Sequence, residues 1–372
     1  MAKNDFHNDR FDEGTKSKLE IFREYFKESF PVFVHSRYFK EILIYDFFAG
    51  QGKDIKGEYG TALNILNEIT AQCQDIRANN KQIFLILNDK DEFETLERNV
   101  KKFLSECRSS CDGVCILKEE ENFVIRSRAF EEYFKELYPR IKRREKSAKL
   151  IFLDPYNFVI DKKLFGNLID LPSADFICFM PSSFLKRFPE EPSFKKYIDA
   201  NEIDFKDSKP AHCHRAIADY FKSIVPNEKE YFIGCFSIKK GSNYYGLLFG
   251  SNHTFGAEKF QRVCWKKDNI TGEADFNIDR ELVYNKLQGI LFEETKIPQK
   301  IKFFNEDLRN KILSKEITTD LDAYKFALKS RCLIKHSAEV LNELMDELKI
   351  EKFKTKNNDI HKIKEPNTIF VL

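Results

Sequence analysis

The chain has 372 residues, and its 62 basic and 60 acidic side chains give a formal net charge of +2. This length predicts two or three domains with a sizeable core, and the near-neutral charge argues against a general basic coat for nucleic acid or membrane binding. No apolar run is long enough to span a membrane, and the nine cysteines are irregularly spaced, so we expect a reduced, cytoplasmic protein with no membrane partner.

Residues 15–29 have apolar side chains at helical spacing and are predicted to form an amphipathic helix. Thr15 is the expected N-cap of this helix. Lys16, Lys18 and Arg23 are interpreted as part of a solvated helix face, the alternative being contact with a phosphate group.

The apolar run 42–44 predicts a buried strand that leads through the stretch 45–52, YDFFAGQG, into a helix over residues 61–73. A strand that ends in Gly-x-Gly lets the backbone approach a ligand and points amide groups at it, which indicates a nucleotide pocket. Ile55 replaces a third glycine, which disfavours a nicotinamide cofactor, and no P-loop lysine follows. The stretch resembles the first motif of amino-methyltransferases that use S-adenosylmethionine. The resemblance assigns cofactor contacts to Asp46, Phe48, Ala49, Gly50 and Gly52.

A second apolar run, 83–87, is followed by Asn88, Asp89, Lys90 and Asp91. A carboxylate at the end of the second strand of a doubly wound sheet accepts the ribose hydroxyls of a nucleotide. We therefore predict that Asp89 binds the cofactor ribose. The alternative is that these acidic residues cap the helix expected at 91–105, a role that suits Asp91.

The third candidate motif follows the apolar strand 149–153 and reads Asp-Pro-Tyr-Asn-Phe over residues 154–158. It resembles the Asp/Asn-Pro-Pro-Tyr motif of the same enzymes, with one proline instead of two. There the acidic side chain accepts hydrogen bonds from an exocyclic amine and the aromatic ring stacks on the base, so that rate comes mainly from positioning. The alternative is a simple turn signal. The expected catalytic residues are Asp154, Pro155 and Tyr156, with Asn157 and Phe158 as substrate contacts.

Three further clusters stand out. Cys107, Cys111 and Cys115 offer three thiols, but a fourth metal ligand is not apparent and a thiol-rich loop is expected. The triplet 212–214, His-Cys-His, is also not expected to bind metal, because adjacent side chains point in different directions. A basic run over residues 140–149 precedes the strand of Asp154; it is interpreted as a solvated face or as a phosphate contact near the catalytic edge.

The remaining patterns complete an α/β sheet. Strands are expected at 122–126, 175–180, 231–238 and 244–251, and helices at 129–137, 162–168 and 216–224. The last two strands are expected to form a hairpin that closes the sheet, which resembles the end of a class I methyltransferase domain. The resemblance implies a doubly wound, Rossmann-like sheet with an antiparallel last strand. Residues 184–212 are interpreted as an insertion that recognises substrate, with Arg187 as a binding residue among aromatic side chains.

The last hundred residues contain two helical patterns, 321–330 and 337–348, and two short extended runs, 350–353 and 369–372. This order resembles a winged helix-turn-helix, although the second helix is acidic, which favours protein docking as much as entry into a DNA groove. The expected organisation is a helical lead-in (1–40), a methyltransferase-like domain (41–300) and a winged-helix-like domain (315–372).

The order of the motifs resembles the three-Cys-motif partner family, bacterial proteins encoded beside a phage-type protein with a three-cysteine motif. The matching pieces are 15–25, 46–52, 153–156, 213–215 and 244–253 running on to Trp265 and Lys266. The family name refers to the neighbour's cysteines, so Cys107, Cys111 and Cys115 are not that motif. The resemblance implies a methyltransferase-like fold and a three-cysteine-motif protein as a partner.

Two functions remain open at this point. The first is an S-adenosylmethionine-dependent N-methyltransferase that acts on a base amine of DNA or RNA, and Asp154 favours it because a scaffold needs no carboxylate there. The second is a catalytically silent partner or scaffold protein, for example in phage defence. The single proline and the acidic second helix near the C-terminus favour this second function.

Overall fold

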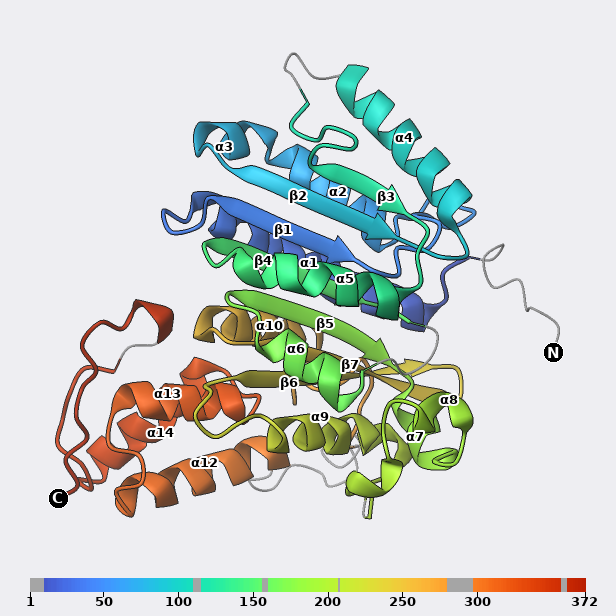
Figure 1. Ribbon diagram of the computed structural model, residues 1–372. Coiled ribbons are helices and arrows are strands. Elements are labelled where there is room, and N and C mark those ends of the chain that lie inside the picture. The colour runs from blue at the N-terminus through green and yellow to red at the C-terminus, as the bar shows by residue number, and fades with distance from the viewer. Residues whose placement is uncertain (1–9, 110–114, 156–159, 207, 280–296, 356–359) are drawn as a thin grey trace.

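The computed structural model describes residues 10–109, 115–155, 160–206, 208–279, 297–355 and 360–372 (Figure 1). A seven-stranded sheet has the order β3-β2-β1-β4-β5-β7-β6, in which β7 runs antiparallel to both of its neighbours. This order, with a reversed strand inserted beside β5, is that of class I methyltransferases, so the expected fold is confirmed. The strands are β1 (Glu41–Asp46), β2 (Gln82–Asn88), β3 (Phe123–Arg126), β4 (Ser147–Leu153), β5 (Ala174–Met180), β6 (Phe232–Lys240) and β7 (Asn243–Ser251).

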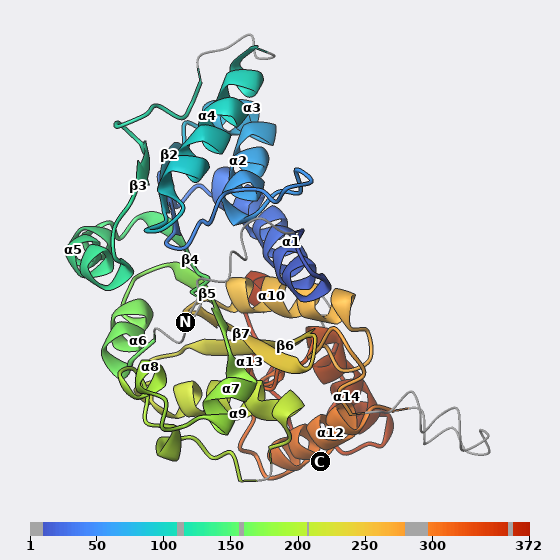
Figure 2. The ribbon, with the colours of Figure 1, turned by 90° about the vertical axis from the view of Figure 1, so that its right-hand side faces the viewer.

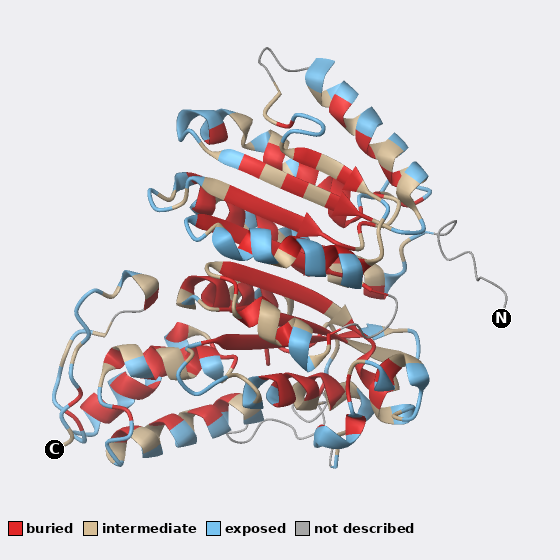
Figure 3. Ribbon diagram, in the orientation of Figure 1, coloured by how far each residue is buried: buried red, intermediate tan, exposed pale blue. Residues whose placement is uncertain are grey.

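Helices cover both faces of the sheet (Figure 2). One face packs against α1 (Glu13–His35), α2 (Thr61–Ala71), α3 (Cys73–Ala78), α4 (Phe93–Ser109) and α10 (Thr254–Lys267). The other packs against α5 (Phe130–Arg143), α6 (Lys162–Ile169) and α9 (Cys213–Ser223). All seven residues of β4 are buried, as expected for a parallel strand covered on both sides. Its neighbours β1 and β5 are also almost entirely buried (Figure 3).

The register of the central strands sets the position of the motifs. Asp46, the last residue of β1, pairs with Leu87 near the end of β2 and with Phe152 near the end of β4. Because the carboxyl ends of parallel strands meet at one edge of a sheet, the segments that follow these three strands emerge side by side. The candidate motifs therefore share the carboxyl edge.

Helix α1 is longer than the sequence predicts, and its N-cap differs. The helix begins after Asp12, whose side chain accepts a 2.7 Å hydrogen bond from the amide of Thr15. The assignment of Thr15 as N-cap was therefore wrong. The first turn of α1 is also tied to the β6–β7 hairpin, because Lys240 at the end of β6 pairs with Asp12 over 3.0 Å.

The insertion after β5 forms short helices, and the C-terminal part is helical. These elements are α7 (Ser182–Arg187), α8 (Pro192–Lys195), η2 (Ala200–Glu202), η3 (Pro210–His212), α12 (Gln299–Leu313), α13 (Asp320–Lys329), α14 (Ile334–Asp346) and η5 (Ile360–Lys362). The two predicted C-terminal helices are present as α13 and α14. A winged-helix unit is not confirmed, because Ile350 and Val371 pair only through an isolated bridge.

A buried charged cluster joins the C-terminal helices to the sheet. Glu273 is 4% exposed and accepts from Arg215 of α9 over 2.6 Å, while Lys300 of α12 pairs with it over 2.9 Å. Burial alone raises the pKa of the Glu273 carboxyl, but the charges of Lys300 and Arg215 outweigh burial and hold the pKa well below its usual value. The indole of Trp265 and the Nζ of Lys300 both donate to the carbonyl of Arg331.

Candidate functional site

A cavity of about 270 Å³ opens at the carboxyl edge of the sheet. Helix α1, the loop after β1, the turns after β2 and β4, strand β5 and the β6–β7 hairpin all contribute to its wall. Of the residues predicted from sequence, it brings together Phe48, Ala49, Gly50, Gly52, Asp89, Asp154 and Pro155. Residues that sequence reasoning did not assign to the site also line it: Phe11, Thr15, Lys18, Leu19, Gln51, Lys53, Asp54, Gly60, Thr61, Phe179, Lys240 and Tyr245.

The glycine loop has the backbone that its sequence suggests. Gly50 and Gly52 have φ values of +56° and +85°, in the region that favours glycine. A Cβ added at Gly50 would meet no atom within 4 Å, so the backbone there borders open space. The loop closes onto the start of α2 through a 2.8 Å hydrogen bond from the amide of Gly60 to the carbonyl of Gly52.

Asp89 joins the second strand end to this loop. Its Oδ2 accepts a 2.8 Å hydrogen bond from the amide of Gly50, and its Oδ1 accepts from the amides of Asp91 and Glu92. Asp89 thus makes the helix-start contacts that the sequence analysis assigned to Asp91. The same carboxylate lines the cavity, so ligand contact and support of the loop fall to one side chain.

Asp46 lies beneath the loop and is fully buried. Its Oδ2 accepts a 2.5 Å hydrogen bond from the hydroxyl of Thr61 at the start of α2, and its Oδ1 accepts from the amide of Phe48. Burial raises the pKa of Asp46 to about 7, with a smaller contribution from the negative charges of Asp154 and Asp89. Asp46 thus holds the glycine loop at Phe48 before the glycines and at Thr61 after them.

Asp154 faces a lysine of the N-terminal helix. The Nζ of Lys18 lies 2.5 Å from Oδ2 of Asp154 and 4.7 Å from the ring centroid of Phe179. The Lys18 side chain is 15% exposed and that of Asp154 25%. The interpretation of Lys18 as part of a solvated face was therefore wrong. Helical periodicity could not reveal this contact, since it joins residues 136 positions apart.

Aromatic rings extend from this part of the cavity. The rings of Phe179 and Tyr245 stack with centroids 5.0 Å apart, and Phe184 of α7 lies 6.0 Å from Tyr245. Arg187 packs over Phe184 and lies on α7, beyond the residues that line the cavity. Tyr156, Asn157 and Phe158, the other predicted substrate residues, lie outside the described residues.

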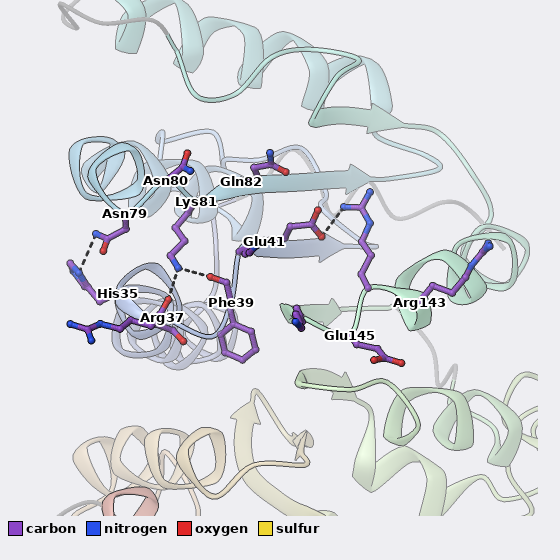
Figure 4. A pocket seen from close by; sticks show the side chains of 14 residues that line it. His35, Arg37, Phe39, Glu41, Asn79, Asn80, Lys81, Gln82, Arg143 and Glu145 are labelled. Carbon is purple, nitrogen blue, oxygen red and sulfur yellow. Dashed lines mark hydrogen bonds and ion pairs between the residues drawn. The ribbon is translucent and has the colours of Figure 1, made fainter.

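A larger hollow of about 790 Å³ opens at the opposite, amino-terminal edge of the sheet (Figure 4). The Nζ of Lys81 donates to the carbonyls of Ser36 and Phe39 there, and Arg144 pairs with Glu41. Part of the basic run at residues 140–149, namely Arg143, Arg144 and Lys146, lines this hollow, because β4 begins at this edge and ends at the other. The expectation that the run adjoins Asp154 was therefore wrong. The basic residues around the hollow are Arg37, Lys40, Lys81, Arg143, Arg144 and Lys146.

The candidate metal ligands do not assemble in the part of the chain that the structure describes. Within those ranges no group of three or more His, Cys, Asp or Glu side chains is placed to hold an ion. His214 is buried, its Nδ1 lies 3.1 Å from the carbonyl of Ala211, and burial lowers its pKa to about 3. Cys111 lies outside the described residues. None of the described helices combines the length and apolar character that a membrane crossing requires.

No protein-family model and no curated protein matches the chain, so its resemblance to the three-Cys-motif partner family is not confirmed. Solved structures show distant likeness. Trm1 from Pyrococcus horikoshii, in complex with S-adenosyl-L-methionine, is 15% identical over 71% of this chain and 63% of its own, with a TM-score of 0.33. The O-methyltransferase TomG from Streptomyces achromogenes, in complex with the same cofactor, is 10% identical over 65% and 90%, with a TM-score of 0.31. The METTL16 methyltransferase domain is 8% identical over 62% and 82%, with a TM-score of 0.28. At these scores none of them bears on the activity of this chain.

Proposed function

We propose that the chain binds S-adenosylmethionine in the carboxyl-edge cavity and is an N-methyltransferase for an amine of a nucleic-acid base. One observation supports this most strongly: the glycine loop, Asp89 and Asp154 line a single cavity although they follow three different strands. When bound, the cofactor supplies an electrophilic methyl group. Every other requirement, from orientation to desolvation, falls to residues of this chain.

The residues around the cavity fit such a cofactor. The backbone at Gly50 borders open space in which a ligand can approach closely, and Asp89 offers carboxylate oxygens to ribose hydroxyls. Phe48 and Ala49 form the adjoining wall, while Phe47 points into the core against Phe130. Asp46 acts from beneath by holding Thr61 and the amide of Phe48, which keeps the loop in one conformation.

The acceptor amine is assigned to Asp154. A carboxylate at this strand end accepts an N–H of the amine and fixes the direction of its nitrogen lone pair. Pro155 has a fixed φ and restricts the backbone of Asp154 before it. We assign stacking on the base to Tyr156. A base in a duplex must leave the stack to reach this cavity, so single-stranded or flipped nucleotides are the expected substrates. Contacts with the nucleic-acid strand on either side of the target base are assigned to Asn157, Phe158 and Arg187.

A second function is favoured by one observation. Lys18 already forms an ion pair with Asp154, the group assigned to the acceptor amine. A methyltransferase-like protein that had lost catalysis would tolerate such a contact and would act as a partner or scaffold, for example beside a three-cysteine-motif protein. The two functions differ in whether the cavity binds cofactor.

Calorimetric titration with S-adenosylmethionine and S-adenosylhomocysteine tests the proposal. We expect a dissociation constant on the order of micromolar for the wild type. Gly50→Arg should abolish binding because its side chain would fill the cavity. Gly57→Arg is the matched control, since Gly57 also has a positive φ of +84° and open space around its Cβ position, yet lies outside the cavity lining. Wild-type protein that is folded but binds neither ligand would refute the enzyme function.

A further inference from the structure

Lys18 is held in the cavity by the way α1 is anchored. The first turn of the helix meets the β6–β7 hairpin, where the Nζ of Lys240 lies 3.0 Å from Asp12 and 3.3 Å from the hydroxyl of Thr15. Gly14 allows this approach: a Cβ there would lie 2.9 Å from Cβ of Lys240. One turn further along, Lys18 therefore projects over the carboxyl edge from a fixed backbone.

The ammonium group of Lys18 has two neighbours that fix its place. Asp154 accepts one of its three N–H groups, and the face of Phe179 attracts the positive charge. Tyr245 stacks on Phe179 and supports that ring. Lys18 itself lines the cavity, and among the described residues Asp154 is the acceptor found for its Nζ, so its remaining donors can serve a ligand beside Asp154. The cavity thus presents a hydrogen-bond acceptor and a hydrogen-bond donor next to each other.

We propose that Asp154 and Lys18 act as a pair that reads the edge of the target base. Asp154 accepts from the exocyclic amine, and Lys18 donates to the acceptor atom beside it. This inference rests on the proposed function and extends it, because it makes Lys18 a specificity-determining residue. It names the substrate as a base whose amine adjoins a hydrogen-bond acceptor on its Watson–Crick edge.

Base chemistry then selects among the four bases. The amine of adenine adjoins the ring acceptor N1, and the amine of cytosine adjoins the ring acceptor N3, so both match the pair on their Watson–Crick edges. The amine of guanine adjoins an N1–H donor on that edge, which would face the donors of Lys18 and leave buried polar groups unpaired. Thymine and uracil have no amine. The pair therefore favours adenine and cytosine.

The same chemistry argues against Lys18 as a methyl acceptor. Methyl transfer needs a nitrogen that faces the cofactor, whereas the Nζ of Lys18 is directed at Asp154, 2.5 Å away, and at the face of Phe179. The pair also differs from a side chain that only blocks the cavity. Removal of a blocking Lys18 would strengthen substrate binding, whereas removal of a Lys18 that contacts the base would weaken it.

Binding of single-stranded oligonucleotides tests the inference without relying on methyl transfer. The protein is saturated with S-adenosylhomocysteine, and fluorescence anisotropy is measured with oligothymidine strands that contain one central adenine, cytosine, guanine or thymine. We expect the adenine or cytosine strand to bind about fivefold or more tightly than the guanine and all-thymine strands. Lys18→Met should remove this preference, and Lys18→Arg, which retains donors, should restore part of it.

Lys27→Met is the matched control, because Lys27 lies on the exposed face of the same helix, and it should keep the wild-type preference. Equal or tighter binding by Lys18→Met would overturn the inference, as would a methyl group found on Lys18 by peptide mass spectrometry. Intact S-adenosylhomocysteine binding without base preference would contradict the reading pair alone. A wild-type protein that does not bind S-adenosylhomocysteine would contradict the proposed function as well.

Discussion

The amide of Gly50 donates a 2.8 Å hydrogen bond to Oδ2 of Asp89, which joins the loop after β1 to the turn after β2. This contact makes the acidic side chain part of the glycine loop as well as of the cavity wall. Cofactor binding and loop conformation should therefore respond together to substitution of Asp89.

Asp89→Ala leaves the amides of Gly50, Asp91 and Glu92 without their acceptor. We expect a loss of about 1–3 kcal/mol in unfolding free energy and at least about a tenfold loss in affinity for S-adenosylhomocysteine. Chemical denaturation and calorimetry measure the two effects. Asp91→Ala serves as the control and should change both quantities little. An Asp89→Ala variant with wild-type affinity would exclude Asp89 from the ligand site.

Asp46 should make stability depend on pH. Its carboxyl has an ordinary pKa of 3.8, and burial raises the pKa to about 7 in the folded protein. Between these values the folded state retains a proton that the unfolded state has released. The stabilisation is fully present below about pH 4 and is lost as the pH rises through 7.

Asp46→Asn removes this titration and keeps an oxygen that can accept from Thr61. Relative to the wild type, the variant should gain stability between pH 4 and 7, by a few kcal/mol in order of magnitude. Urea denaturation at a series of pH values measures the difference. A difference that stays constant across this range would show that Asp46 is ionised in the folded protein.

Tyr25 of α1 forms a hydrogen bond with a second buried acid, Asp175 of strand β5. Its hydroxyl donates to Oδ2 of Asp175 over 2.6 Å, and burial raises the pKa of Asp175 to about 6. Tyr25→Phe removes the donor, so we expect a loss of about 1–3 kcal/mol above pH 6. Below about pH 4 the loss should be smaller, because Asp175 is then protonated in both states. Thermal or urea unfolding at both pH values checks this; equal losses would contradict it.

The charged cluster around Glu273 should hold the C-terminal helices in place. Glu273→Ala leaves Arg215 and Lys300 without their buried partner, and we expect a loss of about 3–5 kcal/mol. Glu306→Ala, at an exposed position of α12, should change stability by less than about 0.5 kcal/mol. Urea denaturation compares the two variants. Similar losses of unfolding free energy in the two variants would show that the cluster does not hold these helices in place.

The strands and the edge that they share were predictable, because a buried β-strand is recognised in a sequence as a short apolar run. Gly50, Asp89 and Asp154 could be placed together from the rule that parallel strands end at one edge. Lys18 could not, since periodicity assigns a helix face only relative to its own helix. The basic run at residues 140–149 was misplaced for a simpler reason: it lies around the start of β4, and the length of that strand separates it from Asp154.

The proposed function requires that a base held by Asp154 receives a methyl group from S-adenosylmethionine in this cavity. The most direct test is incorporation of labelled methyl from S-adenosylmethionine into total DNA and RNA by the wild type and by Asp154→Ala, with cofactor affinity measured for both. We predict incorporation by the wild type, its loss in the variant, and an unchanged affinity for the cofactor. Incorporation by Asp154→Ala at the wild-type rate would contradict the role of Asp154 in holding the acceptor amine.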